Sequence, residues 1–332
     1  MRPATFWAAD RWELVAALHK DRTLVSAVRR RAGPRAGAVL FLANAHLSAG
    51  PSADRRLRQA EEALAAAAKE AKRLGLDPAV APAVFCGDMN SMGRTAVREF
   101  LVAGEVGPDF REAGDPTEKG QEGRQITSKV RRHAFGCFND AAEACFAPDA
   151  APSTILAANI DAKMLHDDGS VTAAMQEALD AAFDACCGEA GRAEMSKEEV
   201  DAFLLRINKQ LGRGSEYRFV AAAMEKRGAE TLSRADFCDL YKAELAKGKF
   251  WGVEHDLRAL RGGRGMAVPE EGPCELCFDH MLYTAGSLQL VGVQEPLTEE
   301  QRRRVYGEPW EILPNAWHPS DHLPVAAVFA FP

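Results

Sequence analysis

The stretch Ala83-Val-Phe-Cys-Gly-Asp-Met-Asn-Ser91 places an acid and an amide directly after a short apolar run. Residues 84–86 are apolar and are typical of a short buried strand. Gly87 breaks the run, and Asp88 and Asn90 follow two positions apart, so that both side chains can point into one cleft. Asp-x-Asn after a strand is more often a simple turn, because both residues tolerate tight backbones. The stretch therefore needs support from other parts of the chain before it indicates a site.

Three further segments carry Asp, Asn or His beside an apolar run. They are Asn44-Ala-His-Leu47, Phe278-Asp-His-Met-Leu-Tyr283 and Pro319-Ser-Asp-His-Leu-Pro-Val325. When several strand ends each deliver such a residue, one composite site is the most economical interpretation. The candidate site residues are His46, Asp88, Asn90, Asp279, Asp321 and His322.

In this order, the four segments resemble the motifs of the endonuclease/exonuclease/phosphatase superfamily. They look most like its deadenylase-like branch, which includes nocturnin, the Angel proteins and 2′-phosphodiesterase. The resemblance covers residues 4–140 and 266–331, and a set of four motifs is far more specific than a single signature. It implies a DNase I-like α/β sandwich of two packed sheets. It also implies a Mg²⁺-dependent phosphodiesterase, a 3′-to-5′ exoribonuclease of deadenylase type that acts on RNA such as poly(A).

The resemblance implies a role for each residue near the metal and the phosphate. Asp321 would hold Mg²⁺ or Mn²⁺, with help from Asp88 and Asn90, since a carboxylate-rich ligand set favours these ions over zinc. Asp88 would also orient or deprotonate the attacking water. Asn90 and His46 would hold phosphate oxygens. Pro51 lies where the deadenylases place a proline against the substrate base, although a proline in a loop before a helix explains it equally well.

The resemblance also pairs Asp279 with His322. Asp279 would fix the tautomer of His322, which would contact the phosphate or act as a base; the sequence leaves the base open between His322 and Asp88. Two departures from the family pattern stand out. Cys274 replaces an aromatic residue that stacks on the substrate base, and the family's metal-binding glutamate has no counterpart. We therefore expect a domain that is incomplete at its N-terminus, with an isolated chain that lacks full activity.

Composition narrows the class of protein. The chain has 332 residues, of which 47% are hydrophobic and 27% charged, as in globular proteins. Its net charge of −7 argues against a broad basic face for duplex nucleic acid, but leaves room for a local basic cleft. No apolar stretch has the length of a membrane span. The eight scattered cysteines are typical of reduced thiols, so we expect an intracellular, cytoplasmic protein.

Periodicity predicts the elements around the early motifs. Strands are expected at Ala4–Trp7, Glu13–Ala17 and Val39–Ala45, the last one covered on both faces because it hardly alternates. A helical stripe follows from Ser52 to Leu74, with Ser52 as its cap. Gly75 is expected to end this helix.

Residues 148–262 lie outside the family resemblance, so we divide the chain into parts 1–147, 148–262 and 263–332. The middle part has the apolar spacing of four helices. Met195 and Leu232 are 37 positions apart, and each precedes a serine that begins a helix. This arrangement resembles a pair of EF-hand helix-loop-helix units.

The two loops of this insertion, 188–199 and 225–236, are poor calcium sites. Calcium requires six or more oxygen ligands, and Arg192 and Arg227 stand at positions where carboxylates are needed. We therefore do not expect Ca²⁺ as a cofactor. The insertion is expected to be a structural module or to bind a protein partner. The segment 248–255 is aromatic and rich in glycine, and we expect it to dock the insertion onto the core.

Two other functions stay open on the sequence alone. The first is hydrolysis of another phosphoester, such as a small molecule or a lipid headgroup, because Cys274 removes the expected base-stacking residue. The second is a non-catalytic binding module, because the metal-binding glutamate is lacking. Both alternatives keep the same fold.

Overall fold

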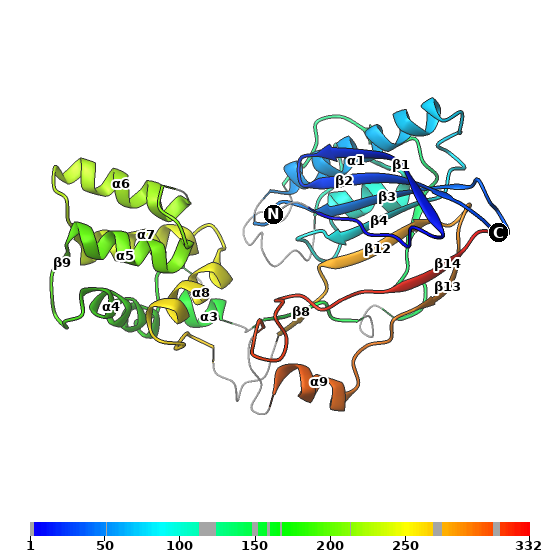
Figure 1. Cartoon of the computed structure of the whole chain (residues 1–332). Coiled ribbons are helices and arrows are strands. Elements are labelled where there is room, and N and C mark those ends of the chain that lie inside the picture. The colour runs from blue at the N-terminus through cyan, green and yellow to red at the C-terminus, as the bar shows by residue number, and fades with distance from the viewer. Residues whose placement is uncertain are drawn as a thin grey trace. The chain divides into compact units, whose positions relative to one another are not determined.

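The computed structural model describes residues 3–50, 52–112, 124–147, 152–157, 160–166, 168–212, 214–267, 274–307 and 313–332. It divides into two compact units (Figure 1). Unit 1 comprises Met1–Leu156 and Glu275–Pro332, and unit 2 comprises Ala157–Cys274. The sequence suggested an insertion from residue 148 to residue 262. In the structure, unit 2 begins later, at Ala157, and ends later, at Cys274. Among the described residues, no helix is both long enough and apolar enough to cross a membrane.

The described part of unit 1 is built on a six-stranded sheet with the strand order β1-β2-β3-β4-β12-β7. These strands are β1 (Trp12–Lys20), β2 (Thr23–Arg30), β3 (Val39–His46), β4 (Ala83–Asp88), β7 (Phe138–Asp140) and β12 (Asp279–Thr284). β3 and β4 are parallel, whereas β12 runs antiparallel to β4. The last residues of β3 and β4 and the first residue of β12 therefore meet at one edge of the sheet.

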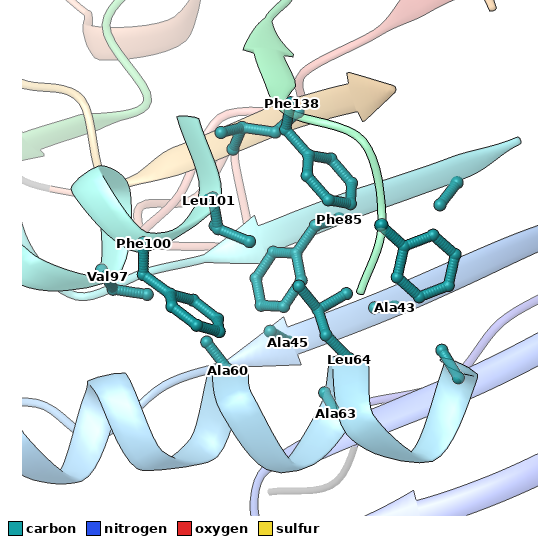
Figure 2. Packing of buried hydrophobic residues seen from close by; sticks show 14 of the residues in the cluster. Ala43, Ala45, Ala60, Ala63, Leu64, Phe85, Val97, Phe100, Leu101 and Phe138 are labelled. Carbon is teal, nitrogen blue, oxygen red and sulfur yellow. The ribbon is translucent and has the colours of Figure 1, made fainter. Parts of the chain in front are cut away.

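Helices α1 (Ala53–Arg73) and α2 (Ala96–Ala103) cover one face of this sheet. Ser52 occupies the N-cap position of α1 as predicted, but its side chain makes no capping hydrogen bond; the chain leaves the helix through Leu74 and Gly75. Figure 2 shows the interface, where alanines of α1 and β3 let the helix lie close to the sheet and aromatic rings of β4 and α2 fill the remaining space. The labelled residues of this core are Ala43, Ala45, Ala60, Ala63, Leu64, Phe85, Val97, Phe100, Leu101 and Phe138.

A second sheet covers the opposite face. It pairs β13 (Gln289–Val293) with β14 (Ala327–Ala330) in antiparallel fashion. Phe329 of β14 packs its ring 5.0 Å from the ring of Tyr283 on β12. Val84 of β4 and Leu288 join the same apolar cluster. The predicted two-sheet α/β sandwich is thus confirmed for the described residues.

Shorter elements complete unit 1. They are β5 (Glu105–Val106), β6 (Arg131–Arg132), β8 (Ile155–Ala157), β11 (Cys274–Leu276) and α9 (Glu299–Tyr306). β5 pairs with β6, and β8 pairs with β11. Because β8 ends at Ala157, the first residue of unit 2, and β11 begins at Cys274, its last residue, this pair joins the two ends of the insertion.

The prediction of strands near the N-terminus was partly wrong. The backbone at Ala4–Trp7 forms no strand, and Phe6 is 91% exposed. The strand predicted at Glu13–Ala17 is longer and pairs with β2, which the sequence analysis did not identify. The apolar residues of 4–7 lack a strand partner, whereas Thr23–Arg30 lies between two neighbours and is mostly buried.

Unit 2 is helical in its described part. Its helices are α3 (Asp161–Met164), α4 (Ala173–Cys187), α5 (Lys197–Asn208), α6 (Ser215–Arg227), α7 (Arg234–Leu245) and α8 (Phe250–Leu260). The loops after α4 and α6 pair through β9 (Glu194–Met195) and β10 (Leu232–Ser233), with Met195 opposite Leu232. Ser196 caps α5 and forms a capping box with Glu199, as expected from the sequence.

The segment 248–255, which was expected to dock the insertion onto the core, lies largely in a helix of unit 2, and its docking stays a prediction. Most of it belongs to α8, whose Val253, Leu257 and Leu260 are buried. This helix contacts α4, α5 and α7, which are all parts of unit 2. The spacing of the three residues places them on one face of the helix, so the aromatic segment contributes to the core of the insertion itself.

Substitution of Gly87 tests how closely β4 approaches β3. The φ of Gly87 is +120° and a Cβ there would lie 2.0 Å from the carbonyl oxygen of Ala45. We expect Gly87→Ala to lower the free energy of unfolding by about 3 kcal/mol, because it adds backbone strain and a clash between strands. The matched variant Gly75→Ala has φ +75° but open space around the new methyl group, and should cost about 1 kcal/mol. Urea unfolding checks both; equal losses would contradict the close approach.

Candidate active site

Strand register brings three of the predicted residues together. His46 at the end of β3 is the parallel partner of Asp88 at the end of β4. Asp279, the first residue of β12, is the antiparallel partner of the same Asp88. Asp88 therefore lies on the central strand of a three-residue row. Its side chain is buried, with 7% of its surface exposed.

The backbone continues this alignment beyond the strands. The N–H of Leu47 donates to the carbonyl of Asp88 at 2.8 Å, and the N–H of Met89 donates to the carbonyl of Phe278 at 2.8 Å. Both bonds fasten residues next to the site to a neighbouring strand. The positions of the site side chains are thus set by the sheet rather than by free loops.

Asn90 holds the Asp88 carboxylate. Its backbone N–H donates to Asp88 Oδ1 at 2.7 Å, and its amide Nδ2 donates to Asp88 Oδ2 at 2.6 Å. Nδ2 also donates to the carbonyl of Leu47 at 3.0 Å. These contacts hold Asn90 in the left-handed region, with φ +49°, which asparagine tolerates better than most residues. In this structure, the amide that was predicted to hold phosphate orients the carboxylate.

His322 joins the site from the last segment of the chain. It forms an isolated bridge with Ile155, and its Nδ1 lies 2.6 Å from Asp279 Oδ2. Because an ionised carboxylate only accepts, Nδ1–H must be the donor. Nε2 of His322 then faces Asp88 Oδ2 at 4.0 Å, and Nε2 of His46 lies 3.8 Å from the same oxygen. The predicted pairing of Asp279 with His322 is present, and two imidazoles flank one carboxylate oxygen.

The pKa values of these groups are shifted by their surroundings. Burial, followed by the negative charge of Asp279, raises the pKa of Asp88 to about 6, although the N–H of Asn90 opposes this. Burial lowers the pKa of His322, but the hydrogen bond to Asp279 and the nearby carboxylates outweigh it, so the net pKa is raised. Burial and the charges of Arg22 and His322 lower the pKa of His46. The two imidazoles therefore differ in their tendency to carry a proton.

Three residues could hold a cation. Carboxylate oxygens of Asp88 and Asp279 and a ring nitrogen of His322 all lie within 4.8 Å of one another. Two carboxylates and an imidazole fit a divalent ion such as Mg²⁺ or Mn²⁺. The side chain of Asp321 is exposed, and its charge acts on Asp88 and His322 from outside this group. Its role as a ligand stays a prediction, and Pro51 lies outside the described residues.

A second polar cluster beside the site was not predicted. Asp140 at the end of β7 accepts from His280 Nδ1 at 2.8 Å and from Arg98 Nη1 at 3.1 Å. His280 follows Asp279 directly, so its side chain points to the opposite face of the sheet. A cavity of about 600 Å³ borders this cluster and is also lined by Arg94. In the sequence, His280 of the Phe278-Asp-His segment was the residue that could have indicated this cluster. Its partner Asp140 could not be identified there, because the pairing depends on β7 lying beside β12.

Comparisons with known proteins give a limited likeness. A scan against protein-family models finds no match, and a search of the curated proteins finds no significant match. The structure is similar to crystal structures of ANGEL2, described as a 2′,3′-cyclic phosphatase, one of them in complex with adenosine-2′,3′-vanadate. For each, the TM-score is 0.46 at 16% identity, over 96% of this chain and 67% of that chain.

It is also similar to the human Nocturnin catalytic domain with a bound sulfate anion. Here the TM-score is 0.35 at 12% identity, over 97% of this chain and 61% of that chain. These are among the proteins that the four motifs resemble. Because both TM-scores lie below 0.5, we base the functional interpretation on the geometry of the site.

The Asp140 cluster predicts a pH-dependent stability. Burial raises the pKa of Asp140, but the hydrogen bond from His280 and the charge of Arg98 outweigh it and lower the pKa to about 2, from 3.8. A lowered acid pKa stabilises the folded state above the unfolded pKa, and this stabilisation is lost as the pH falls through the folded value. We expect Asp140→Asn to cost about 2 kcal/mol at pH 7 and about 1 kcal/mol at pH 3.

Urea unfolding of the wild type and of Asp140→Asn at pH 7 and at pH 3 measures the loss of stability at each pH. Asp77, an exposed aspartate that caps a turn at Ala79, offers the control Asp77→Asn, which should change little between pH 7 and pH 3. A cost for Asp140→Asn that is the same at both pH values would contradict the charged cluster.

Proposed function

We propose that this protein is a phosphodiesterase that uses a divalent cation, Mg²⁺ or Mn²⁺, and acts as a 3′-to-5′ exoribonuclease on RNA such as poly(A). The proposal rests on the arrangement around Asp88 Oδ2. The imidazoles of His46 and His322 flank this oxygen, and Asp279 holds the ring of His322 in place. Phosphodiester hydrolysis needs an oriented water, stabilisation of the charge on the phosphate and a proton for the leaving oxygen. The row of residues on β3, β4 and β12, together with His322, offers a group for each task.

The carboxylates of Asp88 and Asp279 would hold the cation, which leaves Nε2 of His322 free for the substrate. When bound, such an ion neutralises charge on the phosphate oxygens and lowers the pKa of a coordinated water. Asp88 itself is suited to accept a proton from water, because its pKa of about 6 lies close to neutrality. Asn90 keeps this carboxylate in one orientation.

We assign different roles to His322 and His46. Asp279 occupies Nδ1 of His322, so only Nε2 can face a substrate. The raised pKa of His322 suits it to donate a proton to a phosphate or leaving oxygen. His46 has a lowered pKa and is suited to a neutral hydrogen-bonding role. This assignment favours Asp88 as the base and leaves His322 as the donor.

The choice of RNA rests on the four motifs, whose order and spacing resemble the deadenylase-like branch. A compact phosphoester is the second candidate. Cys274 supports it, because it stands where the deadenylase-like branch has an aromatic residue that stacks on the substrate base. A 2′,3′-cyclic phosphate, the class named in the description of ANGEL2 as a 2′,3′-cyclic phosphatase, is one member of this class.

We further propose that unit 2 serves as a structural or partner-binding module without calcium, and that it is an EF-hand-like pair. Arg192 pairs with Glu199 at the end of its own loop, and Arg227 pairs with Asp236 in the second loop. Arg227 also pairs with Glu194 across the two loops. These guanidinium groups compensate the acids that a cation would otherwise bind. A cytoplasmic location stays a prediction from the cysteines, which are free thiols in the described residues.

Hydrolysis assays test the main proposal. With Mg²⁺ or Mn²⁺, we expect Asp279→Asn and His322→Gln each to lower hydrolysis by about 10²- to 10⁴-fold, because each removes half of the proton-donating pair. The control His19→Gln makes the same substitution at an exposed site on β1 and should leave the rate unchanged. Poly(A), adenosine 2′,3′-cyclic phosphate and bis(p-nitrophenyl) phosphate are compared. Cleavage of the small esters with intact poly(A) would reject the RNA assignment in favour of the second candidate.

Calcium titration tests the proposal for unit 2. In the double variant Asp88→Asn/Asp279→Asn, which removes the carboxylates proposed to hold a cation in unit 1, we expect millimolar Ca²⁺ to leave the unfolding midpoint unchanged and to give no binding heat, because the loop acids are already paired with Arg192 and Arg227. A ligand at a hundred times its Kd stabilises a protein by about 2.7 kcal/mol, which calorimetry would detect. Micromolar binding with such a stabilisation would contradict the proposal.

A further inference from the structure

Thr154 is hydrogen-bonded to the backbone beside both members of the Asp279–His322 pair. Its side chain is 1% exposed. Its hydroxyl oxygen accepts from the backbone N–H of Phe278 at 2.9 Å and from that of Asp279 at 3.1 Å. Its carbonyl accepts the N–H of Leu323, the residue after His322, at 2.7 Å. One residue is therefore bonded to both chain segments that form the pair.

The surrounding backbone strengthens this arrangement. Thr154 donates its own N–H to the carbonyl of Leu276 at 2.8 Å, and the next residue, Ile155, forms the bridge with His322. Asp279 is the first residue of β12, where the ladder to β4 ends. The N–H of Asp279 at this strand end is partly buried and needs a partner from outside the ladder. The Thr154 hydroxyl provides that partner for Asp279.

We propose that Thr154 is a positioning residue for the Asp279–His322 pair, an inference that rests on the proposed function for its catalytic meaning. The 2.6 Å bond between Asp279 Oδ2 and His322 Nδ1 directs Nε2 toward Asp88. Removal of the hydroxyl releases the N–H groups of Phe278 and Asp279 on one side of the pair, while the carbonyl bond to Leu323 on the other side remains. The Asp279–His322 bond then lengthens, and Nε2 loses its fixed direction.

Thr284 serves as the control for a purely structural role, because it is a buried threonine whose hydroxyl also accepts a backbone N–H. Thr284 is 2% exposed and lies at the other end of the same strand, β12. Its hydroxyl accepts the N–H of Ala83 at 2.9 Å. Thr284→Val thus removes a buried hydroxyl with a similar partner, but away from the pair. Thr154→Ser keeps the hydroxyl and serves as the conservative rescue.

The first experiment records the downfield imidazole N–H proton resonance of His322 in the full chain by NMR, without metal or substrate. Its loss in His322→Gln assigns it. We expect Thr154→Val to move it upfield or to broaden it, whereas Thr154→Ser and Thr284→Val leave it as in the wild type. An unchanged resonance in a folded Thr154→Val protein would overturn the proposal. This readout does not depend on any hydrolytic activity.

Amide hydrogen exchange of the wild type covers the case in which Thr154→Val does not fold. The N–H of Asp279 should exchange as slowly as that of Ala83, whose partner is the Thr284 hydroxyl. Exchange of Asp279 at the rate of an exposed amide would overturn the proposal.

The second experiment measures kinetics on whichever phosphoester the wild type cleaves. Thr154→Val should lower kcat by about ten- to a hundredfold at nearly constant KM, because the reacting groups lose alignment, and Thr154→Ser should restore it. A changed KM with constant kcat would argue against positioning. If the resonance moves as expected but the wild type cleaves no phosphoester, the positioning role stands and the proposed function fails.

Discussion

The close approach of Gly87 to the carbonyl of Ala45 is the constraint on which the site depends. A side chain at this point would collide with the neighbouring strand, so the absence of one permits the register that sets His46 and Asp279 opposite Asp88. A slip of one residue would turn the Asp88 side chain to the other face of the sheet. The apolar core and the polar site are therefore fixed by the same strand alignment.

This alignment also creates an electrostatic cost. Asp88 is buried beside Asp279, and both burial and the second carboxylate disfavour its charge. Asn90 and His322 offset part of this cost through hydrogen bonds and positive charge. A divalent cation would offset much of the rest, since it would lie among the same carboxylates. The pKa of Asp88 is therefore shifted by its neighbours, as is common where binding groups are held together for function.

Local patterns predicted much of the fold. The apolar run before Gly87 became β4, and the stripe after Ser52 became α1. Patterns failed where long-range pairing decides the outcome. β2 is buried between two strands although it has no alternation, whereas the apolar residues of 4–7 found no partner strand.

The site shows the same division. The family resemblance implied the pairing of Asp279 with His322, which is present, whereas the role of Asp321 as a metal ligand stays a prediction. The resemblance could not predict that the Asn90 amide would orient Asp88, because this depends on a left-handed backbone at that residue. It also could not predict Thr154, whose role depends on β8 lying beside the last segment of the chain. Anomalous diffraction from crystals soaked in Mn²⁺ tests the central claim most directly: the account predicts a Mn²⁺ peak in contact with the carboxylates of Asp88 and Asp279, and saturating Mn²⁺ that leaves this position empty would contradict it.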